Sequence, residues 1–158
     1  MINLRHTGIY VSDLARLAAF YREVFHMHTI CEAVEQADAL LADLFGVPAA
    51  RVKITKLITE QGRASGTGDM LELLELVVPA GKEEKAPWPI EAGLHIAFGV
   101  RDMEATRMAI AAHGGACATR VHDMGNGNLC CFCRDPEGNW LELIARRDAQ
   151  EEGLSPGR

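Results

Sequence analysis

The chain has 158 residues, of which 48% are hydrophobic and 24% charged, and its net charge is −6. This composition is typical of a globular protein of ordinary domain size, and the acidic balance argues against a nucleic-acid or anionic-membrane partner, since both favour a basic face. No segment approaches the roughly 20 apolar residues that a membrane-spanning helix needs.

The N-terminal half predicts a strand, a helix and then further strands. Asp13 fits the N-cap of the helix, which carries apolar residues at helical spacing. Periodicity and turn residues identify the segments in chain order as strand 4–11, helix 14–25, an insertion with helical character near 34–52, strand 51–59 and a glycine-rich turn at 61–68.

The C-terminal half predicts the same order of elements. Residues 94–100 alternate as a strand, and Asp102 fits the N-cap of a helix over 103–113. Residues 135–138 read Asp-Pro-Glu-Gly, which fits a type I turn. The strand that follows places Glu142 on one face between two large apolar neighbours.

The two halves repeat one pattern of histidine and aspartate. His6 precedes Asp13 by seven residues, and His95 precedes Asp102 by seven residues, 89 positions later. A repeat of this length indicates two copies of one supersecondary unit, neither of which buries its sheet face alone.

The ends of the two halves also match. Glu72 follows Gly68 by four residues, as Glu142 follows Gly138, with an offset of 70. The first half therefore holds 19 more residues than the second, and 34–52 is the expected place for them.

We therefore expect an α+β fold of paired βαβββ modules, each running strand, helix and three strands, which form a curved mixed sheet around a shared cleft. The expected boundaries are a first module at 2–80 with the insertion near 34–52, a linker at 81–92, a second module at 93–146 and a polar C-terminal tail at 147–158.

The repeat pairs His6 with His95 and Glu72 with Glu142. Two imidazoles and two carboxylates suit a divalent cation of intermediate hardness, with Zn, Ni, Co, Mn and Fe as candidates. A strand histidine can instead be a hydrogen-bonded rim residue, and a strand glutamate can lie on a solvated face. Duplication of the fold does not require both residue types at equivalent positions twice, which favours the metal interpretation. Glu75 is an alternative to Glu72, but strand parity places it on the opposite face.

The chain resembles the vicinal oxygen chelate superfamily, which includes glyoxalase I, methylmalonyl-CoA epimerase, extradiol dioxygenases and the fosfomycin- and bleomycin-resistance proteins. The resemblance covers about residues 2–146 and rests on five motifs, at 6–14, 19–21, 71–74, 95–102 and 135–143. It implies the paired βαβββ fold and a homodimer. It also implies that His6, Glu72, His95 and Glu142 are the ligands of a divalent metal.

The resemblance implies a metal-dependent lyase or isomerase that removes a proton next to a carbonyl of a small oxygenated substrate through a metal-stabilised enediolate. Glu142 is the first candidate for the base and Glu72 the second. One alternative is an extradiol-type Fe(II) dioxygenase that uses His6, His95 and Glu142. Another is a metal-free protein that sequesters a drug, against which the low aromatic content of 6% argues.

Two further expectations concern the setting of the protein. The N-terminus lacks a signal-peptide pattern, so we expect a cytoplasmic protein. Five cysteines, an odd number, predict free thiols rather than a disulfide framework.

Overall fold

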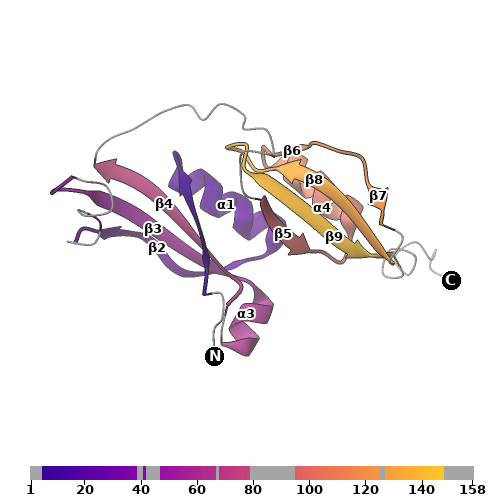
Figure 1. Cartoon of the computed structure of the whole chain (residues 1–158), viewed down its shortest axis with the longest axis horizontal. Helices are drawn as coiled ribbons and strands as arrows, with labels where there is room; N and C mark the ends of the chain where they lie inside the picture. The colour runs from indigo at the N-terminus through magenta and orange to yellow at the C-terminus, as the bar shows by residue number, and fades with distance from the viewer. Residues whose placement is uncertain are drawn as a thin grey trace. The chain divides into compact units, whose positions relative to one another are not determined.

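Figure 1 shows the computed structural model of the chain, which divides into two compact units at Met1–Glu84 and Lys85–Arg158. The described residues are 5–38, 41, 47–66, 68–78, 95–124 and 127–147. The expected linker at 81–92 and almost all of the expected tail lie outside them. None of the helices in the described ranges has the length and apolar character to cross a membrane.

The first unit follows the predicted βαβββ order, with one short helix added. Its elements are β1 (Thr7–Val11), α1 (Leu14–Phe25), β2 (His28–Gln36), β3 (Arg51–Ile58), α3 (Glu60–Ser65) and β4 (Met70–Val78). The four strands form one mixed sheet in the order β1-β4-β3-β2, in which β1 runs parallel to β4 and the other pairs are antiparallel.

The glycine-rich turn predicted at 61–68 is wrong, because α3 occupies most of that segment. Thr59 caps this helix by accepting a hydrogen bond from the Gly62 amide at 3.0 Å. A Cβ atom at Gly62 would lie 2.8 Å from Ile58 and 2.9 Å from Asp69. The glycine therefore permits close packing inside a helix, whereas its presence in the sequence favoured a turn.

Helix α1 forms where the sequence predicts it. The Asp13 carboxylate accepts a hydrogen bond from the Arg16 amide at 3.0 Å, which caps the first turn. Leu17 and Tyr21 are fully buried on the side of the helix that packs against β3 and β4. His26 ends the helix in the left-handed conformation, with φ at 52°, a position where glycine is more usual.

The two faces of the first sheet have different roles. Leu57, Leu71 and Leu73 are buried on the face that α1 covers. Lys56 and Glu72 are cross-strand partners on the opposite face. Farther along that face, residues of the 34–52 insertion close a second apolar cluster, which comprises Leu41, Val47, Ala50, Val52, Ile54, Leu74 and Leu76. Leu41, Val47 and Ala50 thus pack on one end of this face, and Glu72 is not among the residues of this cluster.

The second unit repeats the architecture with a divided strand. Its elements are β5 (His95–Gly99), α4 (Met103–Ala112), β6 (Ala116–Cys117), β7 (His122–Asp123), β8 (Asn128–Arg134) and β9 (Trp140–Arg146). The sheet order is β5-β9-β8-β6, and β7 also pairs with β8. Two short strands, β6 and β7, thus occupy the place of the single strand expected after the helix.

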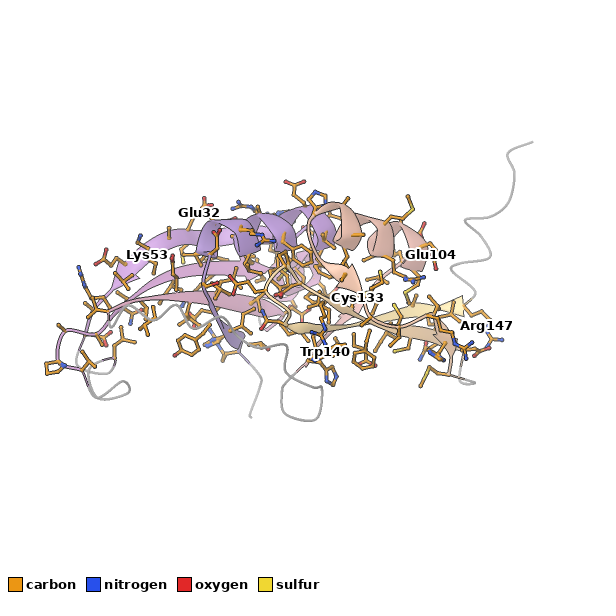
Figure 2. All side chains as sticks on the ribbon, turned by 90° about the horizontal axis from the view of Figure 1, so that it is seen from above. Glu32, Lys53, Glu104, Cys133, Trp140 and Arg147 are labelled. Carbon is orange, nitrogen blue, oxygen red and sulfur yellow. The ribbon has the colours of Figure 1, made fainter. Side chains whose placement is uncertain are left out.

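The second sheet also presents one covered and one open face. Cys133, Leu141 and Leu143 are fully buried on the side toward α4. Figure 2 shows Cys133 on that side and Trp140 on the opposite side of the sheet. Glu142 alternates with the buried leucines along β9, so it shares the open face with Trp140.

The predicted turn before β9 is confirmed, and several hydrogen bonds to Asp135 stabilise it. The Gly138 amide donates to the Asp135 carbonyl at 3.0 Å. The Asp135 carboxylate, only 3% exposed, accepts from the amides of Glu137 and Asn139, each at 2.9 Å, and from the Asn139 side chain at 2.8 Å. This network fixes the start of β9 and hence the positions of its side chains.

Candidate metal centre

Each unit brings one predicted histidine next to one predicted glutamate. The His6 Nε2 atom lies 3.4 Å from a Glu72 carboxylate oxygen, and the His95 Nε2 atom lies 3.2 Å from a Glu142 carboxylate oxygen. The glutamates are the less exposed partners, at 12% and 22% of the side chain, whereas both histidines are 44% exposed. The repeat in the sequence thus identified two residues that lie together in each unit.

The strand register of the two pairs is the same. Gly8 pairs with Glu72 between β1 and β4, and Ala97 pairs with Glu142 between β5 and β9. Both strand pairs are parallel, and in each unit the histidine stands two positions before the small residue. Glu75 falls on the opposite parity from Glu72, on the face toward α1, as predicted.

The separation within each pair fits two ligands of one cation. Ligand atoms bound at about 2.0–2.2 Å to the same ion lie roughly 2.8–3.6 Å apart at angles between octahedral and tetrahedral. Imidazole nitrogen and carboxylate oxygen together also suit the intermediate metals. Within the described ranges, no group of three or more His, Cys, Asp or Glu side chains is gathered around one point. Each unit by itself therefore offers two ligands.

Lys56 is a residue at this site that the sequence pattern did not reveal. Its Nζ atom lies 2.8 Å from the Glu72 carboxylate oxygen that does not face His6. This hydrogen bond to Glu72 is the main reason why the pKa of Lys56 is raised. Both oxygens of Glu72 therefore already have a nitrogen partner within the first unit.

Glu142 has a thiol in the place of that ammonium group. The Cys130 Sγ atom donates to a Glu142 oxygen at 3.2 Å. Burial, followed by this hydrogen bond, raises the pKa of Cys130 to about 11, so the thiol stays protonated at neutral pH. Cys133 lies on the other face, where its hydrogen bond with Cys131 and its burial raise its pKa as well. Cys130 and Cys133 therefore act as neutral groups rather than as thiolate ligands.

The sequence matches one known superfamily over most of its length. The family model described as Glyoxalase/Bleomycin resistance protein/Dioxygenase superfamily matches residues 3–143. The chain belongs to this superfamily. No curated protein matches the sequence at a significant level.

Solved structures of the superfamily share the fold at low sequence identity. A glyoxalase family protein from Bacillus cereus aligns with a TM-score of 0.80 and 20% identity, covering 92% of this chain and 95% of that one. The trypanothione-dependent glyoxalase I of Leishmania major aligns at 0.60 and 22%, covering 97% and 93%. The fosfomycin resistance protein FosX of Listeria monocytogenes aligns at 0.57 and 16%, covering 92% and 93%.

Within the superfamily fold, the two units of this chain differ at the strand that neighbours each glutamate. Lys56 on β3 is the cross-strand partner of Glu72, and Phe132 on β8 is the cross-strand partner of Glu142. One half-site therefore has a cation beside its carboxylate, and the other has an aromatic ring. The repeat in the sequence pointed to the shared histidines and glutamates and contained no signal for this difference.

The small residues beside the histidines leave space on the open faces. A Cβ atom at Gly99 would meet nothing within 4 Å, whereas one at Gly8 would touch the Leu74 side chain at 3.4 Å. Gly99 lies two residues beyond Ala97, the register equivalent of Gly8, so the open space at Gly99 is at the end of β5.

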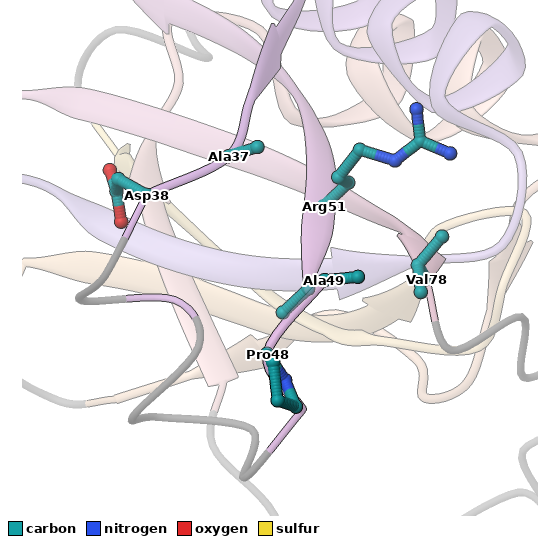
Figure 3. Close-up of a pocket in the computed structure, with 7 residues that line it drawn as sticks. Ala37, Asp38, Pro48, Ala49, Arg51 and Val78 are labelled. Carbon is teal, nitrogen blue, oxygen red and sulfur yellow. The ribbon is translucent and has the colours of Figure 1, made fainter.

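A pocket of about 380 Å³ in the first unit lies away from the paired residues. Figure 3 shows its lining, which comes from the residues just after β2, the residues just before β3, the first residue of β3 and the last residue of β4. Val78 at its wall is six positions beyond Glu72 along β4, or about 20 Å in an extended strand. This pocket is therefore not where a ligand of the His–Glu pairs would lie.

Proposed function

We propose that the protein is a metal-dependent lyase or isomerase that removes a proton from the carbon next to a carbonyl of a small substrate. The observation that carries this proposal is the pair of His–Glu contacts, at 3.4 Å and 3.2 Å, at equivalent register positions in two repeated units. Members of the superfamily typically use a divalent metal. His6, Glu72, His95 and Glu142 are the residues that would hold it.

Glu142 is the proposed base. Its neighbours on the open face are a histidine, a neutral thiol and an aromatic ring, and its cross-strand partner on β5 is the small residue Ala97. Its carboxylate would take the proton from the substrate carbon while the electron pair of the C–H bond moves toward the carbonyl oxygen. Returning the proton to the same carbon gives epimerisation, and returning it to the neighbouring carbon gives isomerisation.

Glu72 is the second candidate base and differs in its surroundings. The Lys56 ammonium lies 2.8 Å from Glu72 and occupies one of its carboxylate oxygens, which favours Glu142 for proton transfer. When bound, the divalent cation supplies Lewis acidity toward the carbonyl oxygen of the substrate. His6 and His95 would orient that cation through their Nε2 atoms.

A second candidate function has a specific observation in its favour. If Lys56 keeps Glu72 as its own ion-pair partner, the remaining ligands are His6, His95 and Glu142. Two histidines and one carboxylate are the ligand set of Fe(II) oxygenases. An extradiol-type dioxygenase would then be the activity, with a catechol as substrate.

One set of measurements separates these functions. Chelator-treated protein is titrated with Zn²⁺, Ni²⁺, Co²⁺, Mn²⁺ and Fe²⁺, and NMR in D₂O follows exchange of the hydrogen next to the carbonyl in a panel of 2-oxo aldehyde adducts and 2-methyl thioesters. We expect metal-dependent exchange that Glu142→Gln abolishes and that Glu75→Gln, a matched glutamate on the opposite face of β4, leaves intact.

The other outcomes each identify a different protein. Oxygen uptake with catechols in the Fe²⁺-loaded protein, without proton exchange, would establish the dioxygenase. Failure to take up any of the five metals would leave the drug-sequestering protein. In either case the proposal of a lyase or isomerase would be withdrawn.

We also propose that the protein works in the cytoplasm as a homodimer. All five cysteines are free thiols, which suits a reducing compartment. The dimer follows from the superfamily resemblance alone, and light scattering coupled to size-exclusion chromatography tests it.

A further inference from the structure

An aromatic cluster lies beside Glu142 on the open face of the second sheet. The ring centroid of Phe132 is 6.1 Å from that of Trp140 and 5.6 Å from that of His95, and both contacts are edge-to-face. The Arg134 guanidinium lies over the Trp140 ring, with its Cζ atom 4.2 Å from the centroid. We call Phe132, Arg134 and Trp140 the aryl cluster. All three are half-buried rather than covered.

The charge of the aryl cluster has no anionic partner on the described residues. Other arginines of the second unit pair with carboxylates, such as Arg107 with Glu104, whereas the only side-chain interaction of Arg134 within the described ranges is the contact with Trp140. A cation–π contact uses the charge of the guanidinium and leaves its N–H donors available. Their planar fork matches a carboxylate bidentately.

A cation–π cluster of this kind can serve packing alone, but packing does not account for the charge of this one. Cation–π pairs occur about once in 70–80 residues of ordinary proteins, so one pair alone indicates no ligand. In this chain Asp and Glu number 22 against 16 Lys and Arg, so carboxylates are abundant, yet Arg134 pairs with none that is described. The guanidinium lies over Trp140, and the Trp140 ring contacts Phe132, which is the cross-strand partner of the proposed base.

Register sets the spacing between the backbone rows that carry Arg134 and Glu142. Arg134 is the cross-strand partner of Trp140, and Phe132 is the partner of Glu142, so these residues form two adjacent rows across the sheet. Rows two residues apart along a strand are separated by about 7 Å. That distance is close to the length of a benzene ring with a carboxylate at one end and a carbonyl at the other.

We propose that the aryl cluster is a substrate subsite that binds an aromatic ring and that Arg134 binds a carboxylate across the ring from the reacting carbonyl. This inference rests on the proposed function in one respect, because it takes Glu142 as the group that faces the carbonyl. Phe132 and Trp140 bind the ring through edge and face contacts. The substrate class is therefore aryl carbonyl compounds with a distant carboxylate.

Binding of three matched probes tests this subsite. Isothermal titration of the full chain uses 4-acetylbenzoate, its neutral amide 4-acetylbenzamide and its saturated analogue 4-acetylcyclohexanecarboxylate. We expect 4-acetylbenzoate to bind most tightly. Arg134→Met should weaken its binding about 10- to 100-fold and change binding of the amide less than about threefold. Trp140→Leu should reduce the preference for the aromatic over the saturated probe about five- to tenfold.

The control is Arg120→Met, since Arg120 is an exposed arginine of the same unit and lies between β6 and β7, outside the aryl cluster. Equal binding of the three probes by the wild-type protein overturns the inference, and so does an effect of Arg134→Met no larger than that of Arg120→Met. The wild-type comparison keeps the test valid if a variant fails to fold. If the protein catalyses proton exchange but binds the three probes equally, the subsite is refuted and the proposed function is not.

Discussion

The replacement of Lys56 by methionine tests whether Glu72 serves as a metal ligand. Lys56 and a divalent cation would compete for the same carboxylate, because the Lys56 Nζ atom lies 2.8 Å from one Glu72 oxygen while His6 approaches the other. Methionine keeps the approximate length of the side chain and removes the charge. If Glu72 is a ligand, Lys56→Met should therefore strengthen metal binding.

The size of the effect follows from the solvent exposure of the pair. Two unit charges about 4 Å apart interact by about 1 kcal/mol in water and about 4 kcal/mol at the effective dielectric of a protein surface. The Lys56 side chain is 36% exposed and Glu72 is 12% exposed, so screening keeps the net value near the lower limit. We expect a gain of about 1–2 kcal/mol, or a roughly 5- to 30-fold lower Kd for the metal.

Isothermal titration of chelator-treated protein with Zn²⁺ measures this change. The matched control is Lys53→Met, a lysine of the same strand on the opposite face. In a Glu72→Gln background, Lys56→Met should have no further effect, because the competing group and the ligand act through one contact. An unchanged or higher Kd in the single variant would refute competition between Lys56 and the metal for Glu72, and it would favour the dioxygenase ligand set.

Three further predictions concern stability in the metal-free protein, measured by urea unfolding. Thr55→Val should cost about 1–3 kcal/mol, because the buried Thr55 hydroxyl accepts a hydrogen bond from the Ala33 amide at 3.0 Å, and Ala33 has φ at 49° in a bulge of β2. Thr55→Ser keeps the hydroxyl and should cost less. Equal losses in the two variants would contradict a stabilising role of this hydrogen bond. Asp135→Ala should cost about 3 kcal/mol and Asp135→Asn less, since the carboxylate accepts three hydrogen bonds. A loss below about 1 kcal/mol in Asp135→Ala would show that the turn is stable without these hydrogen bonds. Burial and Glu142 raise the pKa of Cys130 from 9.0 to about 11, so the contribution of the thiol to the free energy of unfolding is full below pH 9 and is lost as the pH rises toward 11. Wild type should therefore lose about 2–3 kcal/mol more stability than Cys130→Ala over this range. Parallel pH profiles of the two proteins would contradict the raised pKa.

The repeat was the part of the fold that the sequence predicted best. Histidine and aspartate at equal spacing located both N-terminal strands and both capped helices, and the Asp13 and Asp102 carboxylates accept the expected hydrogen bonds. These signals are local, because a cap and its helix are close in sequence. The sequence predicted that the two histidines and two glutamates are equivalent residues, whereas the contact of one histidine with one glutamate inside each unit depends on the parallel register seen in the structure.

The residues that distinguish the two half-sites could not be predicted in the same way. A lysine in the middle of a strand, such as Lys56, usually indicates a solvated face, and its contact with Glu72 depends on the antiparallel register of β3 and β4. The connection between those strands contains α3, which the glycines of 61–68 concealed, so its length did not fix the register. The contact between Arg134 and Trp140 depends in the same way on the pairing of β8 with β9.

The stoichiometry of metal binding tests most directly whether the two units serve one cation. If both supply ligands to the same ion, chelator-treated protein should bind one divalent ion per chain, and His6→Ala and His95→Ala should each abolish that binding. Independent sites in the two units, seen as two ions per chain or as one ion retained in either single variant, would contradict it.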